Sequence, residues 1–392
     1  MVSIKIIAII AILVVVGASL IYITTREEVL LSPEEAGVAP QKVPGVAPQV
    51  TGEACKTIVN NGENKINIVF FAQLNQVQNY IDTLLSAEPF KKNAGSFNFF
   101  LIDSYTPQCE IYKDIAVLCA SEELTKKAAS CPNDYIIVIK DEDPKIRNSA
   151  LGNTISLNSQ SSLSVIQHEL GHALANLADE YSPAKIPANS KNCQQSCEMF
   201  KSLTSDCFSG CSGEGYSRSI ETGIMKSLKA NSFGVFDESL IEEQIKKQAS
   251  QSSPITGKAI TGKAIAEPNV ECAGQKYYLI KGDRTPGDIK ILSRTIEGGC
   301  VGNNGAGPFN YSIIKQDDTI VKEGEFNADV VFTDGQAKDE QIIDGETFDY
   351  EGPFFLKIPI IENTKEIKIS TPTQEISIML GANQSITCMA SP

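Results

Sequence analysis

The sequence predicts an α/β (α+β) domain followed by an all-β sandwich domain, with an N-terminal transmembrane helix ahead of both. Three observations predict this. The N-terminus holds an uncharged apolar run, apolar strand-like runs alternate with helical spacing up to about residue 250, and apolar and polar residues alternate from about residue 268. The 392 residues are enough for two domains that each bury a core.

The N-terminal run extends from Ile6 to Ile23 without a charge and follows Lys5. Its length is near the lower limit for a spanning helix, and the preceding positive charge predicts a cytoplasmic N-terminus. We therefore expect residues 1–28 to be a signal anchor, which makes the protein a single-pass cell-membrane protein with its C-terminal bulk outside. Cleavage near Ala18 would make it a secreted protein instead. Residues 29–54, with a repeated GVAPQ, are expected to form a proline-rich stalk.

Charge and cysteine content narrow the class of protein. A formal net charge of -14 and a pI near 4.8 disfavour nucleic acid as a partner, because the phosphate backbone is itself negative. Eleven cysteines are typical of an exported chain that forms disulfides. The odd number leaves at least one cysteine without a partner in the chain.

Residues 55–250 are expected to form the first domain. Short runs of β-branched and aromatic residues predict buried strands, and apolar residues at helical spacing predict helices between them. The expected strands are 67–73, 97–103, 135–141 and 154–160, and the expected helices are 75–90 and 163–177.

Residues 251–267 contain TGKAITGKAI, a repeat typical of a linker, and residues 268–392 form the second expected domain. Segments such as EIKIS (366–370) and EISIML (375–380) alternate apolar and polar residues between turn-forming residues. An all-β sandwich fits this pattern best. No residue in this domain stands at a catalytic spacing.

The stretch QHELGHALANLADEY, residues 167–181, contains the only two histidines of the chain, His168 and His172. On a helix, residues four apart lie on one face, so both imidazoles can turn toward one ion, and two such nitrogens suit zinc. Glu169 lies about 100 degrees around the helix, near enough to hold a water on the ion without being a ligand. This is the HExxH arrangement.

A catalytic zinc takes three protein ligands, and no third histidine is present. Asp179 lies too far along the same helix to reach the ion, so the helix must break first. Asn176 is the expected breaking point, because asparagine accepts the left-handed conformation that ends helices. We favour Asp179 as the third ligand, and Glu180 as either the alternative ligand or a group that supports the ligands.

The segment HELGHALANLADEY, with INIVFFAQ, EPF and SFNFFLID before it, resembles the HExxH...DEY signature of the IgA-peptidase family of secreted zinc metallopeptidases. The resemblance covers about residues 64–228 and implies a metzincin-like zinc peptidase domain. YSRSIETGIMKS resembles the segment that precedes a methionine turn there, which makes Met225 the candidate; a flexible core filler is the alternative. The chain departs from the family at Ala72-Gln73, where the family often has Gly-Asp.

The resemblance implies a zinc-dependent endopeptidase with one catalytic Zn²⁺. Zinc would lower the pKa of a water and polarise the peptide carbonyl, and Glu169 would act as general base. Tyr181 would either donate to the oxyanion or pack behind the ligands. The expected partners are a protein or peptide substrate that pairs with strand 154–160, the membrane, and a cell-surface polymer bound by the C-terminal domain.

Two other functions stay open: a cell-surface adhesion or binding protein with a non-catalytic structural metal, and a zinc hydrolase of another amide or ester. The insert CQQSCEMFKSLTSDCFSGC also leaves alternatives. Cys193 could pair with Cys211 and Cys197 with Cys207, two other pairings exist, and a four-thiolate zinc site is the remaining alternative.

Overall fold

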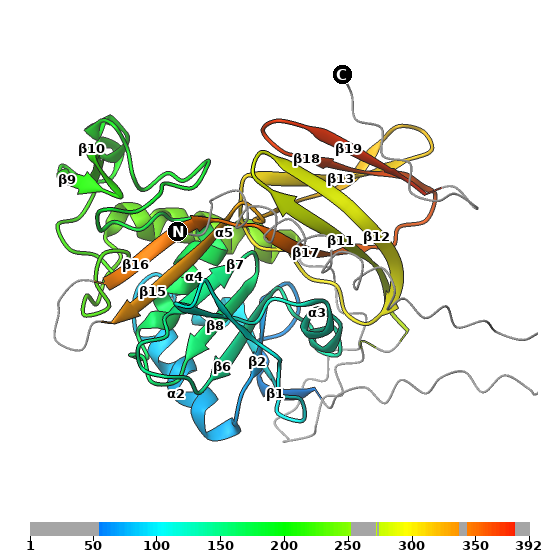
Figure 1. Ribbon diagram of the computed structural model, residues 1–392, viewed down its shortest axis with the longest axis horizontal. Helices are drawn as coiled ribbons and strands as arrows, with labels where there is room; N and C mark the ends of the chain where they lie inside the picture. The colour runs from blue at the N-terminus through cyan, green and yellow to red at the C-terminus, as the bar shows by residue number, and fades with distance from the viewer. Residues whose placement is uncertain (1–54, 252–271, 273, 337–342, 381–392) are drawn as a thin grey trace, which may run out of the picture. The chain divides into compact units, whose positions relative to one another are not determined.

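The structure is a computed structural model that describes residues 55–251, 272, 274–336 and 343–380 (Figure 1). An eight-stranded mixed sheet forms its centre, with strand order β1-β3-β2-β6-β8-β7-β15-β16. Four central strands are parallel: β2 (Ile66–Phe71), β3 (Phe97–Ile102), β6 (Tyr135–Lys140) and β8 (Thr154–Asn158). The others run antiparallel to their neighbours: β1 (Lys56–Val59), β7 (Asn148–Leu151), β15 (Val330–Gln336) and β16 (Ile343–Asp349).

Helices cover both faces of this sheet, because its central strands carry apolar side chains on both sides. The core of one face is formed with α2 (Leu74–Leu84), α4 (Val165–Ala175) and α5 (Val235–Gln251). The core of the other face is formed with α3 (Glu122–Ala128). Helix α4 lies in the middle of its layer, against β7, β8 and β15, so its side chains are enclosed.

Two smaller sheets enclose a separate apolar core. One consists of β12 (Asp288–Gly298), β11 (Lys276–Thr285) and β17 (Gly352–Pro359). The other consists of β14 (Ile320–Phe326), β13 (Phe309–Lys315), β18 (Thr364–Ser370) and β19 (Glu375–Met379). The remaining elements are the pair β4 (Glu110–Tyr112) and β5 (Ala116–Leu118), the pair β9 (Phe208–Cys211) and β10 (Gly213–Arg218), and the short helices η1 (Ala94–Ser96) and η2 (Cys197–Ser202).

The predicted fold class was wrong in two respects: the proportion of helix to strand, and the division of the chain into two domains. Strands predominate among the described residues, with nineteen strands against four α-helices. The hairpin β15–β16, which comes from the predicted sandwich segment, instead extends the sheet of the first domain. The physical reason is that β7 offers an unpaired edge, and the alternating pattern of a strand does not specify which edge it joins. The individual strands β2, β3, β6, β8, β18 and β19 and the helices α2 and α4 lie where expected.

The prediction of a transmembrane helix and a cell-membrane location was also wrong. No helix in the described part of the chain is long and apolar enough to cross a bilayer. The segment that carried the prediction, residues 1–28, lies outside the described residues, as do the stalk and the linker repeat.

Five disulfides join the described cysteines, as is typical of an extracellular or secreted protein. Cys193 pairs with Cys211 and Cys197 with Cys207, which confirms the first pairing considered for the insert and excludes a four-thiolate zinc site there. The other bonds are Cys55–Cys131, Cys109–Cys119 and Cys272–Cys300. Cys388 lies outside the described residues.

Candidate metal centre

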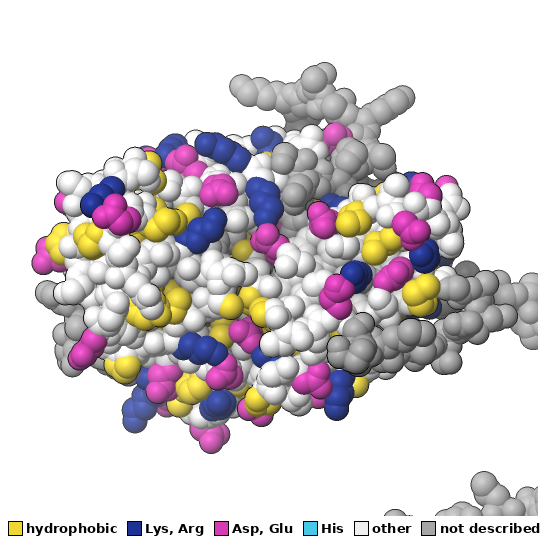
Figure 2. All heavy atoms as spheres, turned by 90° about the horizontal axis from the view of Figure 1, so that it is seen from above, with side chains coloured by type: hydrophobic (Ala, Val, Ile, Leu, Met, Phe, Trp, Pro, Cys, Tyr) yellow, Lys and Arg dark blue, Asp and Glu magenta, His cyan; other side chains and the backbone are white. Residues whose placement is uncertain are grey.

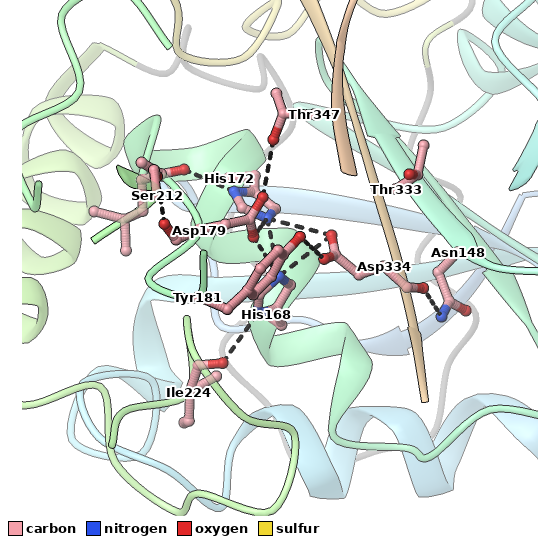
Figure 3. A network of polar contacts seen from close by, with 12 residues as sticks. Asn148, His168, His172, Asp179, Tyr181, Ser212, Ile224, Thr333, Asp334 and Thr347 are labelled. Carbon is pink, nitrogen blue, oxygen red and sulfur yellow. Dashed lines mark hydrogen bonds and ion pairs between the residues drawn. The ribbon is translucent and has the colours of Figure 1, made fainter. Parts of the chain in front are cut away.

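Helix α4 holds the two histidines with their Nε2 atoms 3.0 Å apart (Figure 3). The Nδ1 of His168 donates to the carbonyl oxygen of Ile224 at 2.9 Å, and that of His172 donates to the carbonyl oxygen of Leu177 at 2.7 Å. Because a carbonyl oxygen only accepts, each ring in the neutral form that binds a metal carries its proton on Nδ1. Both Nε2 atoms are therefore free to present a lone pair to the same point, as in metal sites whose histidines are oriented by their other nitrogen.

A left-handed turn after α4 brings Asp179 back to these histidines. Asn176 ends the helix with a φ of 50°, as the sequence predicted, and its N–H donates to the carbonyl oxygen of His172. The Oδ1 of Asp179 lies 3.2 Å from the Nε2 of each histidine. The hydroxyl of Ser212 donates to the Asp179 carbonyl oxygen at 2.6 Å, which fixes the returning segment.

A fourth candidate ligand, the carboxylate of Asp334 in β15, was missed by the sequence reasoning, which expected no site residue in the C-terminal segment. Its Oδ2 lies 3.3 Å from the Nε2 of His168 and 3.5 Å from that of His172. The only signal in the sequence is an acid directly after the apolar run VVFT, two positions from Phe332 on the same strand face. Its partner strand is set by tertiary pairing, which no local pattern reveals.

Five of the six separations among the four candidate ligand atoms are close to those around a tetrahedral ion. A tetrahedron with bonds of about 2.0–2.1 Å has edges of about 3.3–3.4 Å. The five distances given above lie between 3.0 and 3.5 Å. The buried side chains of His168, His172, Asp179 and Asp334 could therefore hold a metal ion together.

Charge favours a cation at this cluster. Burial opposes protonation of the imidazoles, but the carboxylates of Asp334 and Asp179 outweigh it and raise the pKa of His168 well above its ordinary value. The same carboxylates raise the pKa of His172 to about 9 against the effect of its burial. A bound divalent ion would supply the positive charge that the two carboxylates otherwise draw from protons.

Glu169 is fully buried beside the same cluster, and neither of its carboxyl oxygens has a hydrogen-bond partner among the described residues. Burial, with Asp334 as the nearest repelling charge, raises its pKa well above the ordinary value, although both histidines lower it. Burying an amide or hydroxyl without a hydrogen-bond partner costs about 2–7 kcal/mol, and burying an unpaired ionised carboxylate costs more. Such a group is typical of a functional site rather than a packed core.

The remaining predicted residues lie around the cluster in different ways. The hydroxyl of Tyr181 donates to the Oδ1 of Asp334 at 2.7 Å. Glu180 is not one of the four residues whose ligand atoms converge. It lies beside Asp237, and its buried carboxyl has a pKa raised mainly by burial and next by that neighbour. Met225 is buried against α4, where a Cβ on Gly171 would approach its sulfur to 2.8 Å.

The surface in Figure 2 carries interspersed basic and acidic side chains and no visible histidine on that face, consistent with the full burial of both imidazoles. No protein-family model matches the chain, and no curated protein matches it. The resemblance to the IgA-peptidase family therefore stays a prediction, and the function must be argued from the site itself.

Proposed function

We propose that this protein is a zinc-dependent endopeptidase. The observation that carries the proposal is Glu169, a buried acid without a hydrogen-bond partner among the described residues, placed beside two imidazoles and a carboxylate that fit one ion. A site that binds a metal only as a structural staple has no use for such a group, and burying it costs free energy. A carboxyl in this position can serve as the general base for a water on the ion.

The roles of the residues follow from their places. When bound, the ion would act as a Lewis acid that polarises the peptide carbonyl and lowers the pKa of a water. Glu169 would act as the general base that takes a proton from such a water and returns it to the leaving amine, a role for which its raised pKa is suitable. Tyr181, whose hydroxyl already lies at the cluster, donates a hydrogen bond to the substrate oxygen as negative charge develops there.

Substrate pairing with strand 154–160 is not available, because β8 is hydrogen-bonded to β6 on one side and to β7 on the other. The second edge of the neighbouring β7 lies at the cluster but is paired with β15, so a peptide could add to that edge only if β15 left it. An extended peptide added to that edge would present its backbone to the ion.

A structural metal in a binding protein is the second candidate, and one observation favours it. Four protein side chains converge on the ion position, and structural zinc sites are closed by four protein ligands, whereas catalytic sites keep one position open. The endopeptidase requires Glu169 as its general base, whereas a structural metal site has no role for this residue.

The test compares Glu169→Gln with the natural residue, both in the unmodified chain and in an Asp334→Asn background. The second background is needed because Asp334 takes the fourth ligand position, which a catalytic zinc site leaves to water. We expect the Asp334→Asn protein to cleave a panel of denatured proteins, and Glu169→Gln to lower kcat/KM at least about 100-fold with an unchanged zinc content. Zinc-loaded protein that cleaves nothing in either background would refute the proposal and favour the structural metal.

A further inference from the structure

The hairpin β15–β16 occupies the edge of β7 that faces the candidate metal centre (Figures 1 and 3). Its register places Phe332 opposite Ala150 and Asp334 opposite Asn148. The side-chain amide of Asn148 donates to the Asp334 carbonyl oxygen at 2.8 Å, in addition to the pairing of the strands. An internal strand therefore already holds the position that an added peptide would take.

Both strands of the hairpin contact the site residues. The Phe332 ring stacks on the His172 ring at 3.8 Å between centroids, with an interplanar angle of 10°. The Oδ2 of Asp334 lies against both imidazoles, and the hydroxyl of Thr347 donates to the Oδ2 of Asp179 at 2.9 Å. The hairpin thus covers the His172 ring and places the Asp334 carboxylate at the fourth ligand position. It also holds Asp179, the third ligand, through a hydrogen bond.

The other supports of the ligands come from the first domain. The carbonyl oxygens of Ile224 and Leu177 orient the histidines, and Ser212 holds the backbone of Asp179. Removal of the hairpin from the site would leave these three ligands positioned and one corner free for water, as catalytic zinc requires.

We infer that the β15–β16 hairpin is an internal occupant of the peptide-binding edge, with Asp334 as the fourth ligand of the ion, so that the centre accepts water and peptide only when the hairpin moves away. This inference rests on the proposed endopeptidase function for its substrate. The ligand role of Asp334 does not depend on catalysis and can be measured separately.

The hairpin approaches the site so closely that one residue admits no side chain. A Cβ at Gly345 would collide with the hydroxyl of Tyr181, with the Oδ1 of Asp334 and with the carbonyl oxygen of Thr333. Gly345→Ala should therefore push the hairpin off the centre while leaving the charge of Asp334 in place. It offers a route to the open state that is independent of Asp334→Asn.

The experiment uses the full chain loaded with Co²⁺, whose visible absorption reports coordination. In the unmodified chain, the spectrum should be four-coordinate and should respond weakly to acetohydroxamate, because no ligand position is free. In Asp334→Asn and in Gly345→Ala, acetohydroxamate should bind at least about tenfold more tightly, the shift expected when fewer than about a tenth of unmodified molecules are open. The matched control is Glu346→Gln, which should behave as the unmodified chain. Glu346 is an exposed carboxylate on the same hairpin and pairs with Arg147, which precedes β7.

The outcomes separate this inference from the proposed function. Identical cobalt spectra and hydroxamate affinities in all four folded proteins would overturn the inference. If Asp334→Asn opens the cobalt site but cleaves no peptide, the ligand role of Asp334 stands and the peptidase proposal fails. Disulfide content and circular dichroism verify folding, and if one of the two variants does not fold the other still decides the result.

Discussion

At the scale of single residues, two neighbouring acids have different surroundings although they share one segment. Asp179 lies with its carboxylate against both imidazoles, whereas the carboxyl of Glu180 lies beside Asp237, whose pKa burial raises to about 8. The left-handed Asn176 decides this, because it sets the direction from which the chain returns. Each acid should therefore respond differently to conversion into its amide.

We predict that Asp179→Asn lowers zinc affinity at least about 100-fold. Loss of a residue that only orients a ligand lowers metal affinity about 10–100-fold, and loss of the ligand itself should lower it further. Glu180→Gln should change the affinity less than about threefold. Its carboxyl is kept neutral by burial and by Asp237, and an amide of the same shape replaces a neutral acid. Zinc affinity measured with a competing chelator distinguishes the two. Equal losses in both variants would contradict the assignment of the acids.

At the scale of elements, the cysteine-rich insert supports the metal centre from behind. The Sγ of Cys193 lies 3.7 Å from the Asp179 carbonyl oxygen, and Ser212, which donates to the same oxygen, follows Cys211 directly. The Cys193–Cys211 bond therefore anchors the group that fixes the backbone of a ligand. The Cys197–Cys207 bond closes the more exposed end of the insert. Among the described residues, no hydrogen bond joins either of these two cysteines to Asp179.

Replacing Cys193 and Cys211 together by serine should lower zinc affinity about tenfold, the effect of loosening a group that orients a ligand. The matched variant, with Cys197 and Cys207 replaced by serine, should keep the affinity within about threefold. Isothermal titration of the metal-free proteins with Zn²⁺ compares them. A larger effect from the outer pair than from the inner pair would show that the insert does not act through Asp179.

At the scale of the whole molecule, the sequence predicts what is local and fails where distant segments meet. The strand of 135–140, the helix of 165–175 and its break at Asn176 follow from periodicity and backbone preference. Asp334 could not be found this way, because its role depends on the antiparallel pairing of β15 with β7. Single-strand patterns give the face of a residue and not the identity of the neighbouring strand.

The eight-stranded sheet and the three-stranded sheet also meet at a buried lysine. The Nζ of Lys357 in β17 donates to the Oδ1 of Asn133, which precedes β6. Burial lowers the pKa of Lys357 to about 7, although Asp134 opposes this shift. The unfolded chain, with a lysine pKa near the ordinary 10.5, therefore binds more protons than the folded chain between these two values.

It follows that this group makes the free energy of unfolding rise as the pH increases from about 7 toward about 10, and that its destabilising effect is complete below about 7. Lys357→Met should remove that slope and should increase stability most at neutral pH and below. Urea unfolding at pH 7, 8 and 9 tests this, with the exposed Lys290→Met as control. An undiminished slope in Lys357→Met would assign the pH dependence to other groups.

The four candidate ligands are fully enclosed, and this governs how the protein exchanges its metal. An ion enters or leaves only while the hairpin β15–β16 is away from the centre, so uptake and loss both pass through the open state. Chelators should therefore extract the ion no faster than the hairpin opens, whatever their concentration.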